Sequence, residues 1–366
     1  MKTARILVDS REFDSSRKTG IARFLEGLLL QLGGRLAHVQ IFLALGDSAT
    51  LPPTVAGHRG FHHLLLPGNF LQAEWRLSHF SRTGFDLLVS PYPKLPLFGV
   101  GCLSIHTVHD VIDLDERNCN RVFRRSFDRW RLKNALHYAS LTWYVSSWSQ
   151  QQTQNLFGTA GRAPRIRPNG IADIFKKPVD PADASIRSIY GLDVGYVLSL
   201  SNGKPHKNLG VILNLADKVR RPIVLAGFGQ SRRRHWINHP LASAIRWLDP
   251  IPDTHLPAVM RGAFCLVLSS NAEGFGYPPL EAMACGVPVI VSDIPVLQET
   301  TGGNALYADP RRTESWAIAL GQLEDRRRYQ SLSKQGLDWA RRFKGAGAWA
   351  SHVSDIECLL AGHLIH

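Results

Sequence analysis

Short apolar runs recur along this chain, and helical or polar segments separate them. Some, such as residues 287–291, are apolar and mostly β-branched, which is typical of strands buried on both faces. Strands that alternate with helices predict a parallel sheet covered by helices. The expected strands cover residues 4–10, 38–45, 61–67, 85–91, 102–110 and 141–147 in a first sheet, and 196–202, 221–229, 244–250, 263–270 and 288–293 in a second.

The length of 366 residues is more than one core usually accommodates, so two domains are expected. A proline-punctuated stretch, residues 163–185, has the character of an interdomain connection. We therefore predict an α/β protein of two doubly wound, Rossmann-like domains that face each other across a cleft. The expected bounds are 1–170 and 171–345, with a final helix in 346–366 that crosses back to the first domain.

Composition indicates an ordinary globular protein, with 44% hydrophobic residues and a mean hydropathy of −0.10. We find no apolar run near the ~20 residues of a membrane span, and the first ten residues turn charged too early for a signal peptide. We therefore expect the chain in the cytoplasm. The five cysteines show no metal-ligand spacing and favour neither a disulfide framework nor a metal site. They are Cys102, Cys119, Cys265, Cys285 and Cys358.

The formal net charge of +13 calls for an anionic partner, and much of it is local to residues 121–134. Phe123, Phe127 and Trp130 repeat there at helical spacing among arginines. One interpretation is a solvated helix whose aromatic side chains lie in the core. The other is docking to an anionic membrane surface through Arg124, Arg125 and Arg129. No nucleic-acid motif is recognisable, so nucleic acid is not an expected partner.

Residues 271–293 read as a loop, a helix and a buried strand. Glu273 and Glu281 flank a Gly-Phe-Gly turn, and two prolines, Pro278 and Pro279, fit the first turn of a helix. The loop follows a buried strand, at the edge where open parallel sheets bind ligands. A helix start there suits a phosphate. The alternative is that both glutamates are ordinary loop and first-turn acids.

Three further strand ends carry candidate groups. Lys204 and Lys207 lie in the turn after residues 196–202, where lysines can neutralise a diphosphate leaving group, although two solvated lysines are the simpler interpretation. His109 ends the strand of residues 102–110, and such a histidine is also frequently structural. Gly20 opens a turn after the first strand, and Thr19 beside it can cap the helix of residues 19–32.

The order of these segments resembles one known family. Residues 273–293, with Glu273 and Glu281 in an E-x7-E frame, resemble the signature of the retaining glycosyltransferases of family GT4, which have the GT-B fold. Other segments are similar to further parts of that family in the same order. They are "TGIARFLEGLL", "SPYPKLPL", "IHTVHDVIDLD", "YVSSWSQQQTQNLFG", "IRPNGIADIF", "SNGKPHKNL" and "LPAVMRGAFCLVLSS".

The resemblance implies roles for individual residues. It makes the first domain acceptor-binding and the second nucleotide-sugar-binding. Glu273 borders the sugar and the anomeric centre, Lys207 balances the diphosphate, and His109 touches the sugar. Donor binding falls to Gly20, Lys204, Gly274, Phe275, Gly276, Leu280 and Glu281, of which Glu281 holds the ribose. Many members carry an arginine just before the "KN" pair, whereas this chain has Lys204 nearby.

The family's favoured mechanism is front-face attack on the donor sugar with retention of configuration. The resemblance implies neither a metal nor a cofactor, and "DLD" at 113–115 is too short a motif to indicate one. The expected partners are a GDP- or UDP-linked sugar and a saccharide or lipid-linked acceptor for cell-surface polysaccharide or glycoconjugate synthesis. The alternatives are a nucleotide-sugar epimerase of related fold, although the first strand lacks G-x-G-x-x-G, and a non-catalytic basic protein that binds nucleic acid or membrane.

Overall fold

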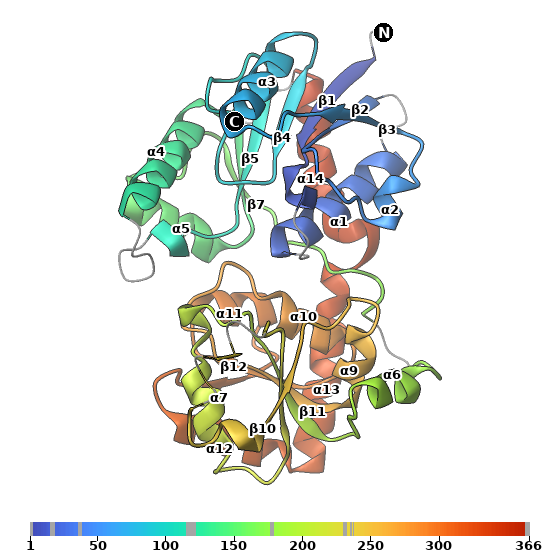
Figure 1. Ribbon diagram of the computed structural model, residues 1–366, viewed down its shortest axis with the longest axis vertical. Coiled ribbons are helices and arrows are strands. Elements are labelled where there is room, and N and C mark those ends of the chain that lie inside the picture. Colours follow the sequence, from blue (N-terminus) through green and yellow to red (C-terminus); the bar gives the residue numbers. More distant parts are fainter. Residues whose placement is uncertain are drawn as a thin grey trace. The chain divides into compact units, whose positions relative to one another are not determined.

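The computed structural model describes residues 3–14, 19–35, 39–114, 122–175, 179–229, 233–234, 236 and 238–362. The chain forms two compact units (Figure 1). The first is Met1–Gly170 together with Gly345–His366, and the second is Ile171–Lys344. Expectations for His38, Asp115, Cys119 and Arg121 lie outside the described residues.

The first unit contains a seven-stranded parallel sheet in the order β3-β2-β1-β4-β5-β6-β7. In register, Ile6 of the central strand lies between Ile41 and Leu87. The strands are β1 (Ala4–Asp9), β2 (Val39–Leu45), β3 (Phe61–Leu65), β4 (Leu87–Ser90), β5 (Leu103–Val108), β6 (Leu141–Tyr144) and β7 (Pro164–Ile166).

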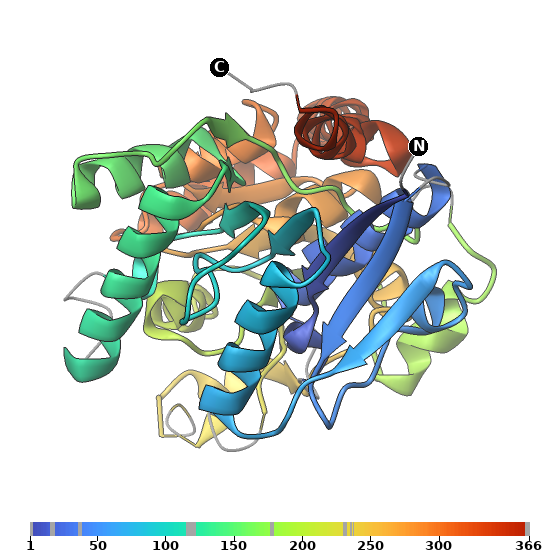
Figure 2. The same cartoon turned by 90° about the horizontal axis from the view of Figure 1, so that it is seen from above.

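Helices cover both faces of this sheet (Figure 2). They are η1 (Arg11–Asp14), α1 (Gly20–Arg35), α2 (Pro53–Ala56), α3 (Phe70–Arg82), η2 (Ile112–Leu114), α4 (Val122–Tyr138), α5 (Ser147–Phe157) and α14 (Gly345–Leu360). Because side chains alternate along a strand, Ile6 and Val8 join the core under α1 and α14, while Leu7 joins the core under α3 and α4.

Helix α1 begins where the sequence predicts, because the Thr19 hydroxyl accepts from the amide of Ala22 at 3.1 Å. The C-terminal helix α14 packs on α1, with the Trp349 and Phe24 ring centroids 5.5 Å apart. A β-carbon at Gly27 would come within 2.4 Å of the Trp349 ring, so only glycine permits this approach. Helix α14 is therefore an integral part of the first unit.

The second unit contains a six-stranded parallel sheet in the order β10-β9-β8-β11-β12-β13. Its strands are β8 (Tyr196–Leu200), β9 (Ile223–Ala226), β10 (Ile245–Leu248), β11 (Ala263–Leu268), β12 (Val289–Ser292) and β13 (Leu306–Ala308). Its helices are α6 (Asp183–Ile189), η3 (Pro205–Lys207), α7 (Leu209–Leu215), η4 (Ala242–Ala244), α9 (Leu256–Gly262), α10 (Tyr277–Ala284), α11 (Pro295–Thr301), α12 (Thr313–Leu323), α13 (Arg326–Ala340) and η5 (Arg341–Phe343).

Every expected strand is present, and the doubly wound α/β prediction is confirmed. The interpretation of residues 163–185 as a connection is wrong in part, because residues 164–166 form β7 and pair with β6. A three-residue strand bounded by prolines is too short to show periodicity. The equally short β13 was not expected for the same reason.

The helix of residues 121–134 corresponds to α4, and its aromatic side chains are not in the core. Phe123 is 94% exposed, Trp130 47% and Phe127 40%, so the interpretation that buries them is wrong. The inward face of α4 is instead Leu132, Ala135 and Leu136. Across the described residues, no helix combines the length and apolar character needed to cross a bilayer.

Strand order places a topological switch point near the centre of each sheet. From β1 the chain builds outward through β2 and β3, then returns to β4 on the other side of β1. From β8 it builds outward through β9 and β10, then returns to β11 on the other side of β8. The points between β1 and β4 and between β8 and β11 are topological switch points, beside which open sheets bind ligands at the carboxyl ends of the strands.

Candidate active site

Two loops meet at the switch point of the second sheet. One follows β8 and contains η3, and the other follows β11. The Ser269 hydroxyl donates to the carbonyl of Lys207 at 3.0 Å, and the amide of Asn271 donates to the carbonyl of His206 at 2.7 Å. Asn208 closes the first loop in a left-handed conformation, with φ of 49°, which asparagine tolerates better than most residues. These bonds hold the loops that carry the predicted diphosphate and sugar residues side by side.

Lys207 and Glu273, predicted from different segments, form an ion pair across these loops. The Lys207 Nζ lies 2.5 Å from the Glu273 Oε1, and the Ser270 hydroxyl donates to the same oxygen at 2.6 Å. Their side chains are 16% and 12% exposed, so the pair is reachable by a ligand. An ammonium held by a carboxylate can turn one of its three donors to an incoming phosphate oxygen.

The Gly-Phe-Gly turn leads directly into α10. Gly276 has φ of 102°, and a β-carbon there would lie 2.8 Å from Leu297 Cδ2, so both conformation and space require glycine. The Thr300 hydroxyl donates to the carbonyl of Phe275 at 2.5 Å and fixes the turn from outside. The helix start therefore presents backbone amides and the positive end of its dipole beside Glu273, which suits an anion.

The remaining residues of the second unit that are predicted to bind the nucleotide-sugar donor differ in exposure. Glu281 lies in the middle of α10 and is 1% exposed, while Leu280 is fully buried in the core. A contact from Leu280 to a ligand would have to come from its backbone. Lys204 lies at the exposed outer end of its loop.

In the first unit, His109 follows β5 and is half-buried. Its Nε2 lies 3.0 Å from the carbonyl oxygen of Pro91. A carbonyl can only accept, so Nε2 carries the proton and Nδ1 is left as an acceptor in the neutral ring. Burial lowers the pKa of His109 to about 4, which keeps the ring neutral near pH 7. His109 can thus accept a hydrogen bond from a hydroxyl. Gly20 is exposed as the first residue of α1.

Sequence reasoning missed a group of charged side chains at the switch point of the first sheet. Asp9 ends β1, Arg11 follows it, and Lys94 lies in the loop after β4. Glu74 of α3 and Arg131 of α4 meet beneath them at 2.7 Å. The position of Asp9 and Lys94 at strand ends was a usable signal. Nothing in the sequences of α3 and α4 marks Glu74 and Arg131 as partners.

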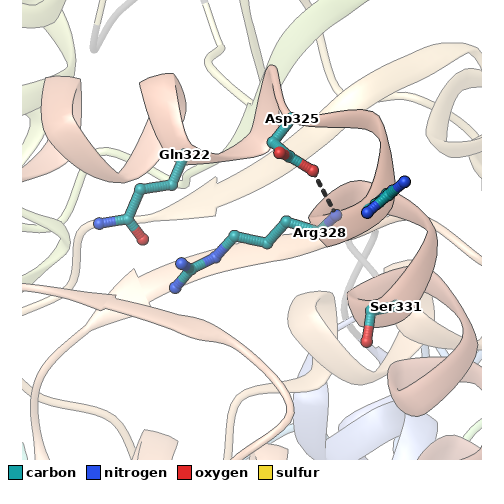
Figure 3. A pocket seen from close by; sticks show the side chains of 5 residues that line it. Gln322, Asp325, Arg328 and Ser331 are labelled. Atoms are coloured by element: carbon teal, nitrogen blue, oxygen red, sulfur yellow. Dashed lines mark hydrogen bonds between the residues drawn. The ribbon is translucent and has the colours of Figure 1, made fainter.

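A hollow on the second unit is separate from these groups. Gln322, Asp325, Arg327, Arg328 and Ser331 line it where α12 ends and α13 begins (Figure 3). Asp325 caps α13 by accepting from the amide of Arg328 at 2.9 Å. Because α12 runs back from the carboxyl end of β13, this junction lies at the opposite edge of the sheet from the start of α10 (Figure 1). None of the predicted site residues lines it.

Comparison with known proteins finds a family match in the second unit. Residues 187–339 match the family model "Glycosyl transferases group 1". O-antigen chain mannosyltransferase B of Escherichia coli is 33% identical over 231 residues, which cover 58% of this chain and 59% of that protein. O-antigen chain mannosyltransferase RfbU of Salmonella typhimurium is 33% identical over 135 residues, 35% of this chain and 38% of that protein. The alignments span less than two thirds of these relatives' own lengths.

Solved structures match along nearly the whole chain. Sucrose-phosphate synthase from Thermosynechococcus elongatus superposes with a TM-score of 0.79 at 18% identity, over 99% of this chain and 100% of that one. WaaG, a glycosyltransferase involved in lipopolysaccharide biosynthesis, superposes with a TM-score of 0.73 at 13% identity, over 96% and 99%. The fold is GT-B. Anabaena HepE in complex with UDP-glucose gives a TM-score of 0.75 at 17% identity, over 97% and 99%.

The GT-B fold divides the predicted residues between its two units. In the second unit the structure brings together Lys207, Glu273 and the Gly-Phe-Gly turn, with Glu281 one helical turn further along. In the first unit His109 and Gly20 belong to the carboxyl end of the sheet and the start of α1. The family model covers every predicted residue of the second unit and none of the first.

Proposed function

We propose that this chain is a retaining, metal-independent glycosyltransferase of family GT4. It moves a sugar from a GDP- or UDP-linked donor to a saccharide or lipid-linked acceptor in cell-surface polysaccharide or glycoconjugate synthesis. The observation that carries the proposal is the Lys207–Glu273 pair at the switch point of the second sheet, beside the start of α10. The match to the group 1 glycosyl transferases and the O-antigen mannosyltransferases among the relatives support it.

In the proposed reaction each group has one role. Lys207, with Lys204 at the rim, and the amides at the start of α10 stabilise the charge that develops on the departing diphosphate. Glu281 accepts from the ribose and Glu273 borders the sugar. The neutral His109 accepts from a sugar hydroxyl through Nδ1. The bond from the anomeric carbon to the phosphate oxygen breaks as the acceptor oxygen bonds on the same face, and the acceptor proton passes to the leaving phosphate.

Nucleotide binding tests this proposal and separates it from the alternatives. A ligand at 100 times its dissociation constant stabilises a protein by about 2.7 kcal/mol, so a thermal-shift screen of UDP, GDP, ADP and dTDP should identify the base. The matching nucleotide sugar should then be hydrolysed slowly without acceptor and without redox change. An epimerase would convert the sugar instead. A protein that none of the four nucleotides stabilises, and that binds anionic polymers with a steep salt dependence, would not be a glycosyltransferase.

We propose further that α4 docks the enzyme peripherally on the inner face of the cytoplasmic membrane. Phe123, Phe127 and Trp130 are exposed on the helix that also carries Arg124, Arg125 and Arg129. Exposed aromatic side chains among cations are the arrangement that enters an anionic lipid interface. Each arginine near such a surface contributes about 1 kcal/mol, screened by salt.

Liposome flotation tests the docking surface. Changing Arg124, Arg125 and Arg129 together to glutamate should abolish binding to anionic vesicles and leave nucleotide affinity unchanged. The matched control changes three exposed arginines of the same unit outside α4, Arg35, Arg59 and Arg162, to glutamate. Equal binding of the wild type to neutral and anionic vesicles, or equal losses in the two triple variants, would exclude this surface.

A further inference from the structure

The switch point of the first sheet gathers charged side chains from separate elements. Arg11 binds Asp9 with two bonds, Nε to Oδ1 at 2.8 Å and Nη2 to Oδ2 at 2.6 Å, and its Nη1 donates to Glu74 Oε1 at 2.9 Å. Arg131 Nη2 donates to Glu74 Oε2 at 2.7 Å and to the carbonyl of Leu95 at 2.6 Å. We call these residues, together with Lys94, the β1–β4 cluster.

The two carboxylates of the β1–β4 cluster are fully engaged. Asp9 is 2% exposed and Glu74 has no exposed surface. Burial disfavours the charged form of Asp9, but the charge and hydrogen bonds of Arg11 outweigh it and hold the pKa below its usual range. The two guanidinium groups of Arg11 and Arg131 therefore match these two carboxylates. A third carboxylate, Glu12, lies beside the cluster, where it is hydrogen-bonded by Thr19 and by the Tyr92 side chain.

Lys94 is the third cation of the cluster. Its ammonium lies 4.7 Å from the centre of the Tyr92 ring, and across the described part of the chain it has no ion-pair partner. Burial lowers the pKa of Lys94, and the attraction of Asp9 and Glu74 is opposed by Arg131 and Arg11. A half-buried ammonium in such surroundings is stabilised by an added anion.

Arg11 offers a second donor to the same anion. Three of its five N–H groups are used by Asp9 and Glu74, which leaves one on each terminal nitrogen. Its side chain is 16% exposed, so part of it reaches the surface. A guanidinium already held by two carboxylates needs no reorganisation to bind a phosphate or carboxylate.

The loop that carries Lys94 is also tied to the proposed sugar site. His109 Nε2 donates to the carbonyl of Pro91, three residues before Lys94 along the chain. The Ser90 hydroxyl donates to the carbonyl of Lys94 at 2.8 Å and folds the loop back over the end of β4. Asp9 and Glu74 are already bonded by Arg11 and Arg131, so neither carboxylate needs Lys94 as its ion-pair partner.

We propose that the β1–β4 cluster binds an anionic group of the acceptor, a phosphate or a carboxylate, with Lys94 as its counter-ion and Arg11 as its second donor. This inference rests on the proposed function, because it names the acceptor's chemical class. Two sources share this chemistry. The anion belongs either to the saccharide itself or to the diphosphate of a lipid-linked acceptor.

Calorimetry on the full chain tests the cluster with defined probes. Glucose 6-phosphate is compared with glucose, and geranyl diphosphate with geraniol, in the wild type and in Lys94→Gln. Loss of a charge-assisted hydrogen bond should weaken the affinity for the anionic probe about 10- to 100-fold, and Lys94→Arg should restore that affinity. Lys133→Gln, an exposed lysine of the same unit, is the matched control and should bind as the wild type does. The anionic probe whose affinity falls in Lys94→Gln identifies the source of the anion.

UDP or GDP binding, measured in the same variants, separates this inference from the proposed function. Unchanged nucleotide affinity in Lys94→Gln shows that the second unit is intact, and an unchanged circular dichroism spectrum shows that the first unit is folded. If both anionic probes then bind Lys94→Gln as tightly as the wild type, or bind the wild type no better than their neutral counterparts, the cluster is not an anion site. Failure of the wild type to bind any nucleotide would instead overturn the proposed function and this inference with it.

Discussion

The two switch points share a topology but differ in how they present charge. Beside β8 and β11, one ammonium faces one carboxylate, both partly exposed, and a helix start supplies backbone amides. Beside β1 and β4, two buried carboxylates are locked by two guanidinium groups, and one lysine is left over. The second sheet therefore offers an exchangeable pair and main-chain donors. The first offers a rigid network beside one lysine, Lys94, that forms no ion pair with the described residues.

This difference determines at which of the two sites binding energy can change during a reaction. The Lys207–Glu273 pair can open to follow charge as it moves from sugar to phosphate, because both partners reach solvent. The β1–β4 cluster is fixed by the ion pairs of Arg11 and Arg131 with Asp9 and Glu74, so it can only recognise a charge that is already present. The first arrangement suits chemistry and the second suits selection of a substrate.

The largest effect should come from breaking the exchangeable pair. Lys207→Ala removes a charged donor from a preorganised site, which costs roughly 100- to 1,000-fold in turnover. Lys204→Ala should be milder, because Lys204 is exposed at the loop's outer end. Steady-state sugar transfer measures both, with circular dichroism as the check on folding. A Lys207→Ala enzyme of normal turnover would remove Lys207 from the mechanism.

The next effect separates the two glutamates. Glu273→Gln should depress turnover about 100-fold with little change in nucleotide affinity, since its charge matters as the sugar becomes positive. Glu281→Gln should weaken binding of the donor and of free nucleotide alike, by about 10-fold, since the proposed ribose contact would be present before and during reaction.

Calorimetry with free nucleotide, beside steady-state kinetics, distinguishes these outcomes. Both substitutions keep the side-chain shape, which matters most for Glu281, at 1% exposed. Nucleotide binding lost in Glu273→Gln and only turnover lost in Glu281→Gln would reverse the roles. Variants that match the wild type in both measurements would place the active site elsewhere.

The last prediction concerns the acid stability of the first unit and not its binding or turnover. Burial lowers the pKa of His106 and His352 to about 3 and that of His109 to about 4. The unfolded chain binds these protons near pH 6.5 while the folded chain does not, so the free energy of unfolding falls as pH drops from 6.5 toward 4. Each histidine contributes up to about 1.4 kcal/mol per pH unit.

Hydrogen exchange followed by mass spectrometry can measure the protection of backbone amides in each unit separately. Between pH 6.5 and 4, peptides from β5 and α14 should lose protection more steeply than peptides from β8 and β11, after correction for intrinsic exchange. His352→Phe, at a position surrounded by aromatic rings, should reduce the slope for α14. Equal slopes in the two units would contradict the assignment of neutral buried histidines.

Much of the candidate site could be located from local sequence. The strand at residues 263–270, the two prolines and the glycines of the turn are each recognisable within a few residues, because a backbone's local preferences depend on its immediate neighbours. Together they predicted the start of α10 and the edge of the sheet where Glu273 lies. The pairing of Glu273 with Lys207 follows less directly, because it requires β8 and β11 to be neighbours.

The sequence by itself determined the alternation of strands and helices, the Thr19 cap and the Gly-Phe-Gly turn, all of which are set by contacts within about one turn or one strand. Only the tertiary structure decided the strand order, and with it which strand ends meet. It also decided that Glu74 and Arg131, 57 residues apart, would form a buried pair while Phe123 stayed exposed. Such outcomes depend on which helices share a face of the sheet, and no local pattern encodes that neighbour.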